Sequence, residues 1–175
     1  MINYYMKIIR KIIRELTLKW RKPERYFIER KILPQIKNKK VLIVGVARYT
    51  ANYPIKLKTN EVITIDLDPK VAKYGAQKHI ISSITNAEKY FSAKYFDVIL
   101  MLGVFGYGLN ERKNGEKAMK VCYNLLKNNG KLFLQWNTIP SHNQINPKLL
   151  KNYKSFISKE IYKTKKSIFE LLVKK

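Results

Sequence analysis

The stretch that most constrains the fold of this chain is residues 41–68, VLIVGVARYTANYPIKLKTNEVITIDLD. An apolar run, VLIV, stops at Gly45, and a second run, VITI, stops at Asp66, 21 residues after the glycine. Neither run shows polar alternation, which is typical of central parallel strands covered on both faces. A strand that ends in a glycine turn, followed by a strand that ends in a carboxylate, is how a parallel α/β sheet binds a nucleotide-like cofactor. The glycine lets the backbone approach the ligand, and the carboxylate accepts hydrogen bonds from a ribose diol.

Further strand signals follow over residues 79–81, 98–102 and 131–136, and a longer helix is predicted over residues 111–127. The sequence NNG at 128–130 predicts a glycine cap after that helix. Residues 153–162 and 167–173 have the pattern of two strands joined by a lysine-rich turn. We therefore expect an α/β fold: a doubly wound, mostly parallel, Rossmann-like sheet with a C-terminal antiparallel hairpin and an N-terminal helical extension.

The N-terminal segment has the pattern of an amphipathic helix over residues 2–20, followed by a short helix over residues 24–33. We predict that residues 1–36 are a basic helical extension and that residues 37–175 are the α/β domain. We favour an arrangement in which the apolar stripe packs on that domain; the alternative is an interfacial helix on anionic lipid. At 100° per residue one side holds Tyr5, Ile8, Ile9, Ile12, Ile13, Leu16 and Trp20, and the other holds Lys7, Arg10, Lys11, Arg14, Glu15 and one apolar residue, Leu18.

The net charge of +24 is extreme and is concentrated at the two ends of the chain. Residues 1–40 carry 13 basic and 3 acidic groups, and residues 148–175 carry 9 and 2. Such ends suit a polyanionic partner, either RNA or an anionic membrane surface. The explanation we favour is compositional, because 29 of the 36 basic residues are lysines scattered along the chain, as an AT-rich genome would produce.

Several classes of protein are disfavoured by what the chain contains. No apolar run approaches the length of about 20 residues that a membrane span needs, and the N-terminus lacks the pattern of a secretory signal. We therefore expect a cytoplasmic location, with peripheral association with a membrane as the variant. Two histidines and one cysteine lie far apart, so no metal site is expected. Cys122 falls in an apolar helical pattern and is expected to be buried and inert.

Two further stretches make the pattern more specific. The strand at 98–102 is followed by GVFGYG at residues 103–108, and LLKNNGKLFLQW leads into the next strand. With the turn GVARYT after the first strand, these residues resemble the class I S-adenosylmethionine (SAM)-dependent methyltransferases over about residues 40–136. The resemblance implies methyl transfer, with SAM as the cofactor. It does not extend to residues 1–35.

The resemblance also implies roles for individual residues. The turn after the first strand would lie against the methionine part of SAM, Asp66 would bind the ribose hydroxyls, and Ser83 stands where many members carry an aspartate that binds the adenine amino group. The implied cofactor-binding residues are Gly45, Val46, Ala47, Arg48 (paired with the methionine carboxylate), Asp66, Leu67 (beside the adenine), Ser82, Ser83, Gly103 and Val104 (at the methyl-donor end).

An NAD-binding domain is the main competitor, since it also places an acid on a ribose about 20 residues after its glycines. That domain needs G-x-G-x-x-G to hold a pyrophosphate, and the turn G-V-A-R-Y-T lacks the second and third glycines. SAM has no pyrophosphate, so the turn favours SAM. Asp68 is better placed than Asp66 to cap the helix that begins near Pro69, which leaves Asp66 for the ribose. Asp97 is expected to be structural.

The methyl acceptor is less legible. An N/D-P-P-Y/F sequence, which amino-methylating DNA enzymes carry after the fourth strand, is replaced by LGVFGYG. We expect transfer to the oxygen or nitrogen of a small molecule or glycan. The alternative is a non-catalytic or RNA-directed module that uses its basic ends. Candidates for acceptor contact or proton transfer are His142, Asn137 and Tyr107.

Overall fold

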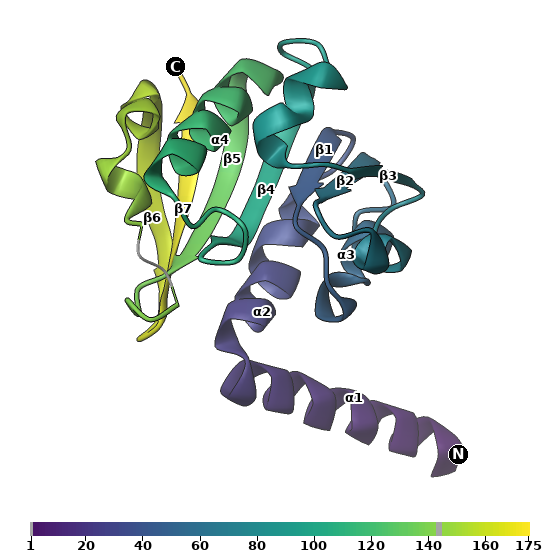
Figure 1. Cartoon of the computed structure of the whole chain (residues 1–175). Coiled ribbons are helices and arrows are strands. Elements are labelled where there is room, and N and C mark those ends of the chain that lie inside the picture. The colour runs from purple at the N-terminus through teal and green to yellow at the C-terminus, as the bar shows by residue number, and fades with distance from the viewer. Residues whose placement is uncertain (1, 143–144) are drawn as a thin grey trace.

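The computed structural model describes residues 2–142 and 145–175, apart from several side chains of the first helix. Within these residues one mixed sheet runs in the order β3-β2-β1-β4-β5-β7-β6 (Figure 1). This order confirms the predicted Rossmann-like fold class. The strands are β1 Lys40–Val44, β2 Glu61–Asp66, β3 Lys78–Ile81, β4 Phe96–Phe105, β5 Leu126–Asn137, β6 Phe156–Lys163 and β7 Ser167–Lys174.

The first five strands pair in parallel, and the last two form the predicted antiparallel hairpin. In the central strand β1, Val41 is paired with Val62 on one side and with Val98 on the other. The hairpin begins at Phe156 and not at residue 153 as predicted, because residues 151–155 form a 3-10 helix instead. The chain reverses direction at β7, so the start of β7 lies beside the end of β5.

Alternate residues of β1 face opposite layers, as in any strand. Leu42 and Val44 pack toward α4 (Arg112–Leu125), which covers one face of the sheet. Val41 and Ile43 pack toward the segment before β1, which covers the other face. Both faces of β1 are therefore buried, which is the physical reason that its sequence shows no polar alternation.

Most of the other connections are short 3-10 segments, so α4 is the one long crossover helix among the described residues. It ends at Leu125, earlier than residue 127, and the left-handed residue after it is Asn129 (φ 60°) and not Gly130 as the NNG pattern predicted. Gly130 matters for another reason, since a Cβ there would lie 2.8 Å from the Lys127 carbonyl oxygen. The short segments are η3 Arg48–Thr50, α3 Tyr53–Lys56, η4 Pro69–Tyr74, η5 Ile84–Lys89, η6 Pro147–Leu149 and η7 Lys151–Ser155.

The segment before β1 consists of α2 (Pro23–Phe27), η1 (Ile28–Ile32) and η2 (Leu33–Gln35). Its apolar residues belong to the core on that face. Within it the buried Glu29 pairs with Arg25 at 2.6 Å and with Lys56 at 3.4 Å, so an ion-pair cluster ties this segment to α3. The domain division predicted at residue 36 stays a prediction; the described contacts join residues 28–36 closely to the sheet.

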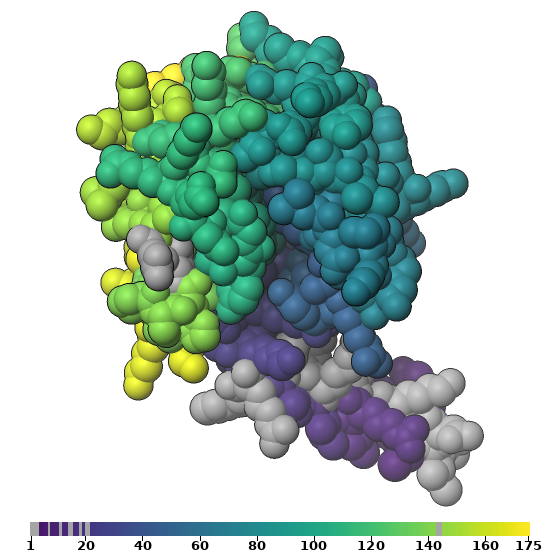
Figure 2. Space-filling view, viewed as in Figure 1, coloured from purple at the N-terminus to yellow at the C-terminus, as the bar shows by residue number. Residues whose placement is uncertain are grey.

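Helix α1 (Ile2–Arg21) projects away from the rest of the molecule (Figures 1 and 2). The prediction that its apolar stripe packs on the domain is wrong for the residues described. Tyr5, Ile9 and Ile13 are 60%, 48% and 57% exposed, and Ile8, Ile12 and Leu16 are exposed as well. The side chains of Lys7, Lys11, Arg14, Glu15, Leu18 and Trp20 lie outside the described part. Among the described residues, no helix combines the length and apolarity needed to cross a membrane.

Three side chains predicted to be structural are confirmed as such. The Asp68 carboxylate accepts a hydrogen bond from the Lys70 N–H and so caps η4. Asp97 accepts from the Lys40 N–H and from Lys127 Nζ, both at 2.9 Å. Burial would raise the pKa of Asp97, but these bonds outweigh it and lower it. Cys122 is buried in α4, and burial raises its pKa to about 12.

Candidate active site

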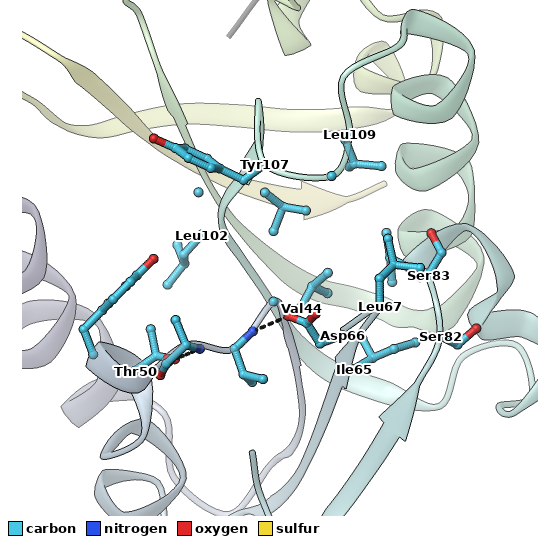
Figure 3. A pocket seen from close by; sticks show the side chains of 18 residues that line it. Val44, Thr50, Ile65, Asp66, Leu67, Ser82, Ser83, Leu102, Tyr107 and Leu109 are labelled. Atoms are coloured by element: carbon cyan, nitrogen blue, oxygen red, sulfur yellow. Dashed lines mark hydrogen bonds between the residues drawn. The ribbon is translucent and has the colours of Figure 1, made fainter. Parts of the chain in front are cut away.

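The candidate site is a cavity of about 250 Å³ at the carboxyl ends of β1, β2, β3 and β4. Ligands of open α/β sheets bind at this edge, near the point where the strand order reverses. Here that point is between β1 and β4, which start the two halves of the sheet. The cavity is lined by residues 44–47, 49, 50, 65–67, 82–84, 102–104 and 107–109 (Figure 3).

The turn after β1 holds its own backbone N–H groups inside the protein. The Gly45 N–H donates to the Ile65 carbonyl at 2.9 Å, in continuation of the β1–β2 ladder. The Val46 N–H donates to Asp66 Oδ2 at 2.7 Å, and the Ala47 N–H donates to Thr50 Oγ1 at 2.9 Å. A pyrophosphate cradle needs such N–H groups to point at the anion. This turn therefore does not form a pyrophosphate cradle.

Gly45 is favoured by its backbone conformation. Its φ is +81°, in the left-handed region that side chains rarely adopt, and a Cβ there would lie 3.4 Å from Val104 Cγ2. The turn after β1 thus lies next to Val104, near the end of β4. The approach and the bonds of the Gly45 and Val46 N–H groups are not visible in the sequence, since they depend on how the strands pair, whereas the bond from Ala47 to Thr50 is local.

Asp66 is half-buried at the end of β2, where its carboxylate faces the cavity and bridges two backbone segments. One oxygen accepts from Val46, and the other accepts from the Asp68 N–H at 2.9 Å. A carboxylate has about four acceptor sites, so two bonds to the backbone leave capacity for a diol. Figure 3 shows the bond between Asp66 and the turn after β1, with Leu67 and the serines at the end of β3 nearby.

The end of β3 contributes Ser82 and Ser83. The Ser83 hydroxyl oxygen accepts from the Thr85 N–H at 3.2 Å and from Thr85 Oγ1 at 2.9 Å, which caps η5. Both acceptor positions of the Ser83 hydroxyl are therefore occupied by Thr85, and the hydroxyl can bond to a ligand only by donating its hydrogen. Leu67, which is 58% exposed, lies beside these serines in the lining (Figure 3).

Strand β4 continues to Phe105, beyond the predicted end at residue 102, and turns locally at Gly103 (φ +79°), where its register with β5 shifts between Leu102 and Phe105. A Cβ there would lie 3.1 Å from Gln135 Oε1, so the side chain of β5 packs directly against this turn. Gln135 Nε2 donates to Ser167 Oγ at 3.0 Å, and that hydroxyl donates to Asn137 Oδ1 at 3.1 Å. A polar chain thus supports the turn from behind, across β5 and β7.

The structure separates the three candidates for acceptor chemistry. Tyr107 lines the cavity and is 65% exposed. Asn137 lies outside the lining, bonded to Ser167, and His142 is exposed in the loop after β5, also outside the lining. Arg48 is likewise exposed and does not line the cavity, although its neighbours in the turn do.

Eight lining residues are not among the site residues predicted from the sequence: Val44, Tyr49, Thr50, Ile65, Ile84, Leu102, Gly108 and Leu109. Thr50 had a local signal, since a threonine three residues after Ala47 can close a turn. Tyr49 is exposed at the cavity; burial of its hydroxyl and, less strongly, the neighbouring Tyr107 raise the pKa of Tyr49. Its phenol therefore stays protonated near neutral pH and acts as a hydrogen-bond donor.

The residues present fit SAM. The cofactor consists of an adenine, a ribose with a free diol, a sulfonium and an amino acid, with no pyrophosphate. The cavity offers a carboxylate for a diol, apolar side chains for a ring, and two left-handed glycines where a ligand passes close to the backbone. Together with the strand order, these features define the fold and site of a class I SAM-dependent methyltransferase.

Comparisons with known proteins agree with that class. A family model described as "Methyltransferase domain" matches residues 44–134, more than half of the chain. The chain therefore belongs to this family; it is a SAM-dependent methyltransferase, and SAM is its cofactor. A search of curated proteins found no match.

Solved structures show the same fold at low sequence identity. N-methyltransferase NodS from Bradyrhizobium japonicum WM9, in complex with S-adenosyl-L-homocysteine, is 14% identical with a TM-score of 0.67, and the match covers 94% of this chain and 97% of that one. A SAM-dependent methyltransferase from Archaeoglobus fulgidus is 14% identical with a TM-score of 0.67, covering 91% and 98%. One from Bacteroides fragilis, also with S-adenosyl-L-homocysteine, is 16% identical with a TM-score of 0.64, covering 84% and 76%.

Proposed function

We propose that SAM lies across the carboxyl ends of β1 to β4, with its methionine part along Gly45, Val46 and Ala47. Asp66 binds the ribose diol, and Leu67 covers one face of the adenine. The observation that carries this placement is the turn after β1, whose N–H groups are occupied by Ile65, Asp66 and Thr50. Such a turn suits the sulfonium and amino acid of SAM better than a phosphate.

At the proposed adenine end, the site differs in one respect from the family pattern. Because Ser83 accepts two bonds from Thr85, its hydroxyl is a donor toward the ligand. We propose that it donates to a ring nitrogen of the adenine, with Ser82 beside it, where an aspartate would accept from the amino group. Arg48 would reach the methionine carboxylate by folding its long side chain over the turn, since it starts outside the lining.

At the donor end, Gly103 and Val104 border the methyl group. SAM supplies an electrophilic methyl group, so the reaction is an in-line displacement: the carbon–sulfur bond breaks as a bond forms to the acceptor oxygen or nitrogen, and the acceptor proton passes to water. The protein's main contribution is to hold the acceptor in line at van der Waals distance. Tyr107 is the candidate best placed to contact the acceptor, since it lines the cavity whereas His142 and Asn137 do not.

We propose a small polar acceptor, a small molecule or glycan methylated on oxygen or nitrogen. The cavity is modest in size and is flanked by Tyr49, Tyr107 and Leu109, which suits a small group. The end of β4 holds Leu102 and Gly103 in place of the Asn/Asp-Pro-Pro sequence that would stack an extruded base. Both observations favour this acceptor over a nucleic acid base.

Incubation with methyl-labelled SAM tests the proposal. Separate samples of metabolite extract, glycan extract and total RNA are the acceptors, and calorimetry of SAM binding is run beside them. We expect micromolar SAM binding and label in the metabolite or glycan sample. Label confined to RNA would refute the proposed acceptor, and no SAM binding by the intact protein would refute the proposed site.

A second candidate acceptor or partner is RNA, bound through residues 1–40 and 148–175, which carry +10 and +7. This hypothesis predicts tight RNA binding, with an association constant whose logarithm falls steeply as the logarithm of the salt concentration rises. Weak binding at physiological salt would exclude it. In this version residues 1–36 are a docking extension of the domain formed by residues 37–175.

A further inference from the structure

The apolar face of α1 is the main feature of the described chain that neither the cavity nor the core explains. Its six described side chains are 38% to 60% exposed. At 100° per residue they span an arc of about 140°. A contiguous exposed apolar face marks an interaction surface, because water is a poor environment for it. The six residues, called here the apolar face, are Tyr5, Ile8, Ile9, Ile12, Ile13 and Leu16.

The charge of α1 indicates what covers that face. Residues 2–21 contain six basic residues and one acidic residue. At helical spacing five of the six basic residues fall opposite the apolar face, and Lys19 falls within its arc. A helix with this division lies in the interface of an anionic bilayer, with its apolar face at the acyl boundary and its basic side chains among the headgroups. RNA would contact the basic side and would leave the apolar face in water. The basic residues are Lys7, Arg10, Lys11, Arg14, Lys19 and Arg21.

The position of α1 relates this surface to the active site. Directly after α1, Glu24 Oε1 accepts a hydrogen bond of 2.9 Å from Thr164 Oγ1, in the turn between β6 and β7. That turn lies at the carboxyl edge of the sheet, because Ser167 at the start of β7 pairs with Asn137 at the end of β5. The cavity opens at the same edge, and α1 projects from it (Figures 1 and 2). Three lysines in and beside this turn add basic groups there: Lys163, Lys165 and Lys166.

We propose that α1 docks this methyltransferase on an anionic membrane with the cavity mouth toward the headgroups, so that the acceptor is a small polar group carried at the membrane surface. The identity of the acceptor rests on the proposed function, whereas the docking does not depend on the cofactor roles. Docking would place the cavity at a surface where the local concentration of the acceptor is high, so the enzyme and the acceptor would not have to meet by diffusion through solution.

Vesicle co-sedimentation tests the docking. Vesicles of phosphatidylcholine with phosphatidylglycerol are compared with vesicles of phosphatidylcholine alone, using wild type, Ile9→Gln/Ile13→Gln, and the matched control Thr17→Gln. The double variant removes apolar surface at constant charge, and Thr17 is an exposed polar residue outside the apolar arc. We expect wild type and Thr17→Gln to bind the anionic vesicles at least about tenfold more tightly than the neutral ones, and the double variant to lose at least about tenfold.

Equal binding by the double variant, or equal binding to neutral vesicles, would overturn the proposal. So would tight binding of single-stranded RNA that the same double variant abolishes, because the apolar face would then serve RNA. A wild-type dimer in sedimentation that ignores vesicles and becomes a monomer in the double variant would assign the face to a second copy of the chain. Ile12→Gln/Leu16→Gln repeats each measurement on an independent variant.

The orientation is tested with a fluorophore at either edge of the sheet. Lys166→Cys places a label at the carboxyl edge, and Lys39→Cys places one before β1, at the amino edge. The native Cys122 is buried and stays unlabelled. Brominated lipids are expected to quench the label at position 166 and not the label at position 39; equal quenching, or quenching only at 39, would refute the orientation.

The acceptor is tested with methyl-labelled SAM and whole membranes. Label in the membrane fraction supports a membrane-borne acceptor, and label only in the aqueous extract overturns that part. Calorimetry distinguishes this failure from failure of the proposed site, because the double variant should bind SAM as wild type does. A wild type that binds vesicles but not SAM would refute the cofactor roles and leave the docking supported.

Discussion

Substitution of Asp66 by asparagine is the most direct test of the site, since this carboxylate has both a structural and a proposed binding role. In the folded protein it accepts one bond from the Val46 N–H at 2.7 Å and one from the Asp68 N–H at 2.9 Å. Asparagine keeps only one acceptor oxygen. Its NH₂ group must therefore face one of these N–H donors, and the negative charge is lost.

The magnitude follows from these two bonds. A hydrogen bond to a charged group contributes about 1.5–3 kcal/mol, and a half-buried site belongs at the lower end, so losing one lowers the free energy of unfolding by about 1.5 kcal/mol. For a chain of this size that corresponds to about 3–6 °C in Tm. Loss of the charged acceptor for the ribose diol should weaken SAM binding by about 2 kcal/mol, which is about 30-fold in Kd.

The assay is calorimetric titration with SAM beside urea unfolding of the same samples. Asp68→Asn is the matched control, because it makes the same chemical change two residues away, on a side chain outside the cavity lining. Asparagine is an equally good N-cap for η4, so the control should keep both its stability and its SAM affinity. A Kd for Asp66→Asn within threefold of wild type, or an equal loss in Asp68→Asn, would refute the assignment of Asp66 to the ribose.

Three further predictions concern the rest of the domain. Burial would raise the pKa of Glu29, but hydrogen bonds from Arg25 and Asn52 and the charges of Arg25 and Lys56 outweigh burial and lower this pKa. The stabilisation by Glu29 is therefore present above the ordinary glutamate pKa of about 4.3 and is lost as pH falls through the lowered value. Glu29→Gln should cost about 2 kcal/mol in urea unfolding at pH 7, with a difference from wild type that narrows toward pH 3; a constant difference would contradict the ion-pair account. Gly103→Ala should cost about 1–2 kcal/mol and exceed the cost of Gly108→Ala, since both glycines have positive φ but only the Cβ at 103 meets Gln135. Cys122 should not react with a thiol reagent at pH 8 in the folded protein and should react fully in urea, and rapid reaction without urea would show that its helix opens.

The parts of the fold that could be predicted from the sequence are those encoded by local pattern. Unbroken apolar runs identify β1, β2 and β4, because a strand covered on both faces must be apolar on both. The helix cap formed by Asp68 could also be predicted, because its carboxylate bonds to the N–H of Lys70, only two residues further along the chain. The exposure of α1 could not, because an apolar stripe has the same spacing whether a sheet or a lipid surface covers it.

Within the site, the sequence predicted which strand ends meet, but it did not predict which hydrogen bonds their polar groups make. Ser83 occupies an aspartate position in the family pattern, yet its oxygen serves Thr85. Arg48 lies in the turn, yet it is exposed and outside the cavity lining, whereas Tyr49 and Thr50 belong to the lining. Such outcomes depend on the backbone dihedral angles after a turn, which decide the direction of each side chain and which a sequence motif does not specify.

The turn after β1 shows why the missing glycines identify the cofactor class. In a dinucleotide fold, glycines leave the N–H groups of the turn uncovered so that a pyrophosphate can accept from them. Here the Ala47 N–H is taken by Thr50, which stands where the third glycine of such a fold would be, and the Val46 N–H is taken by Asp66 from the neighbouring strand. A phosphate at this turn would have to displace the Asp66 carboxylate, with which it would share a negative charge. A sulfonium or ammonium is attracted by the same carboxylate. The loss of glycines and the internal pairing of the N–H groups therefore have one common consequence: the turn lacks the free donors that a pyrophosphate needs and that SAM, which has no pyrophosphate, does not need.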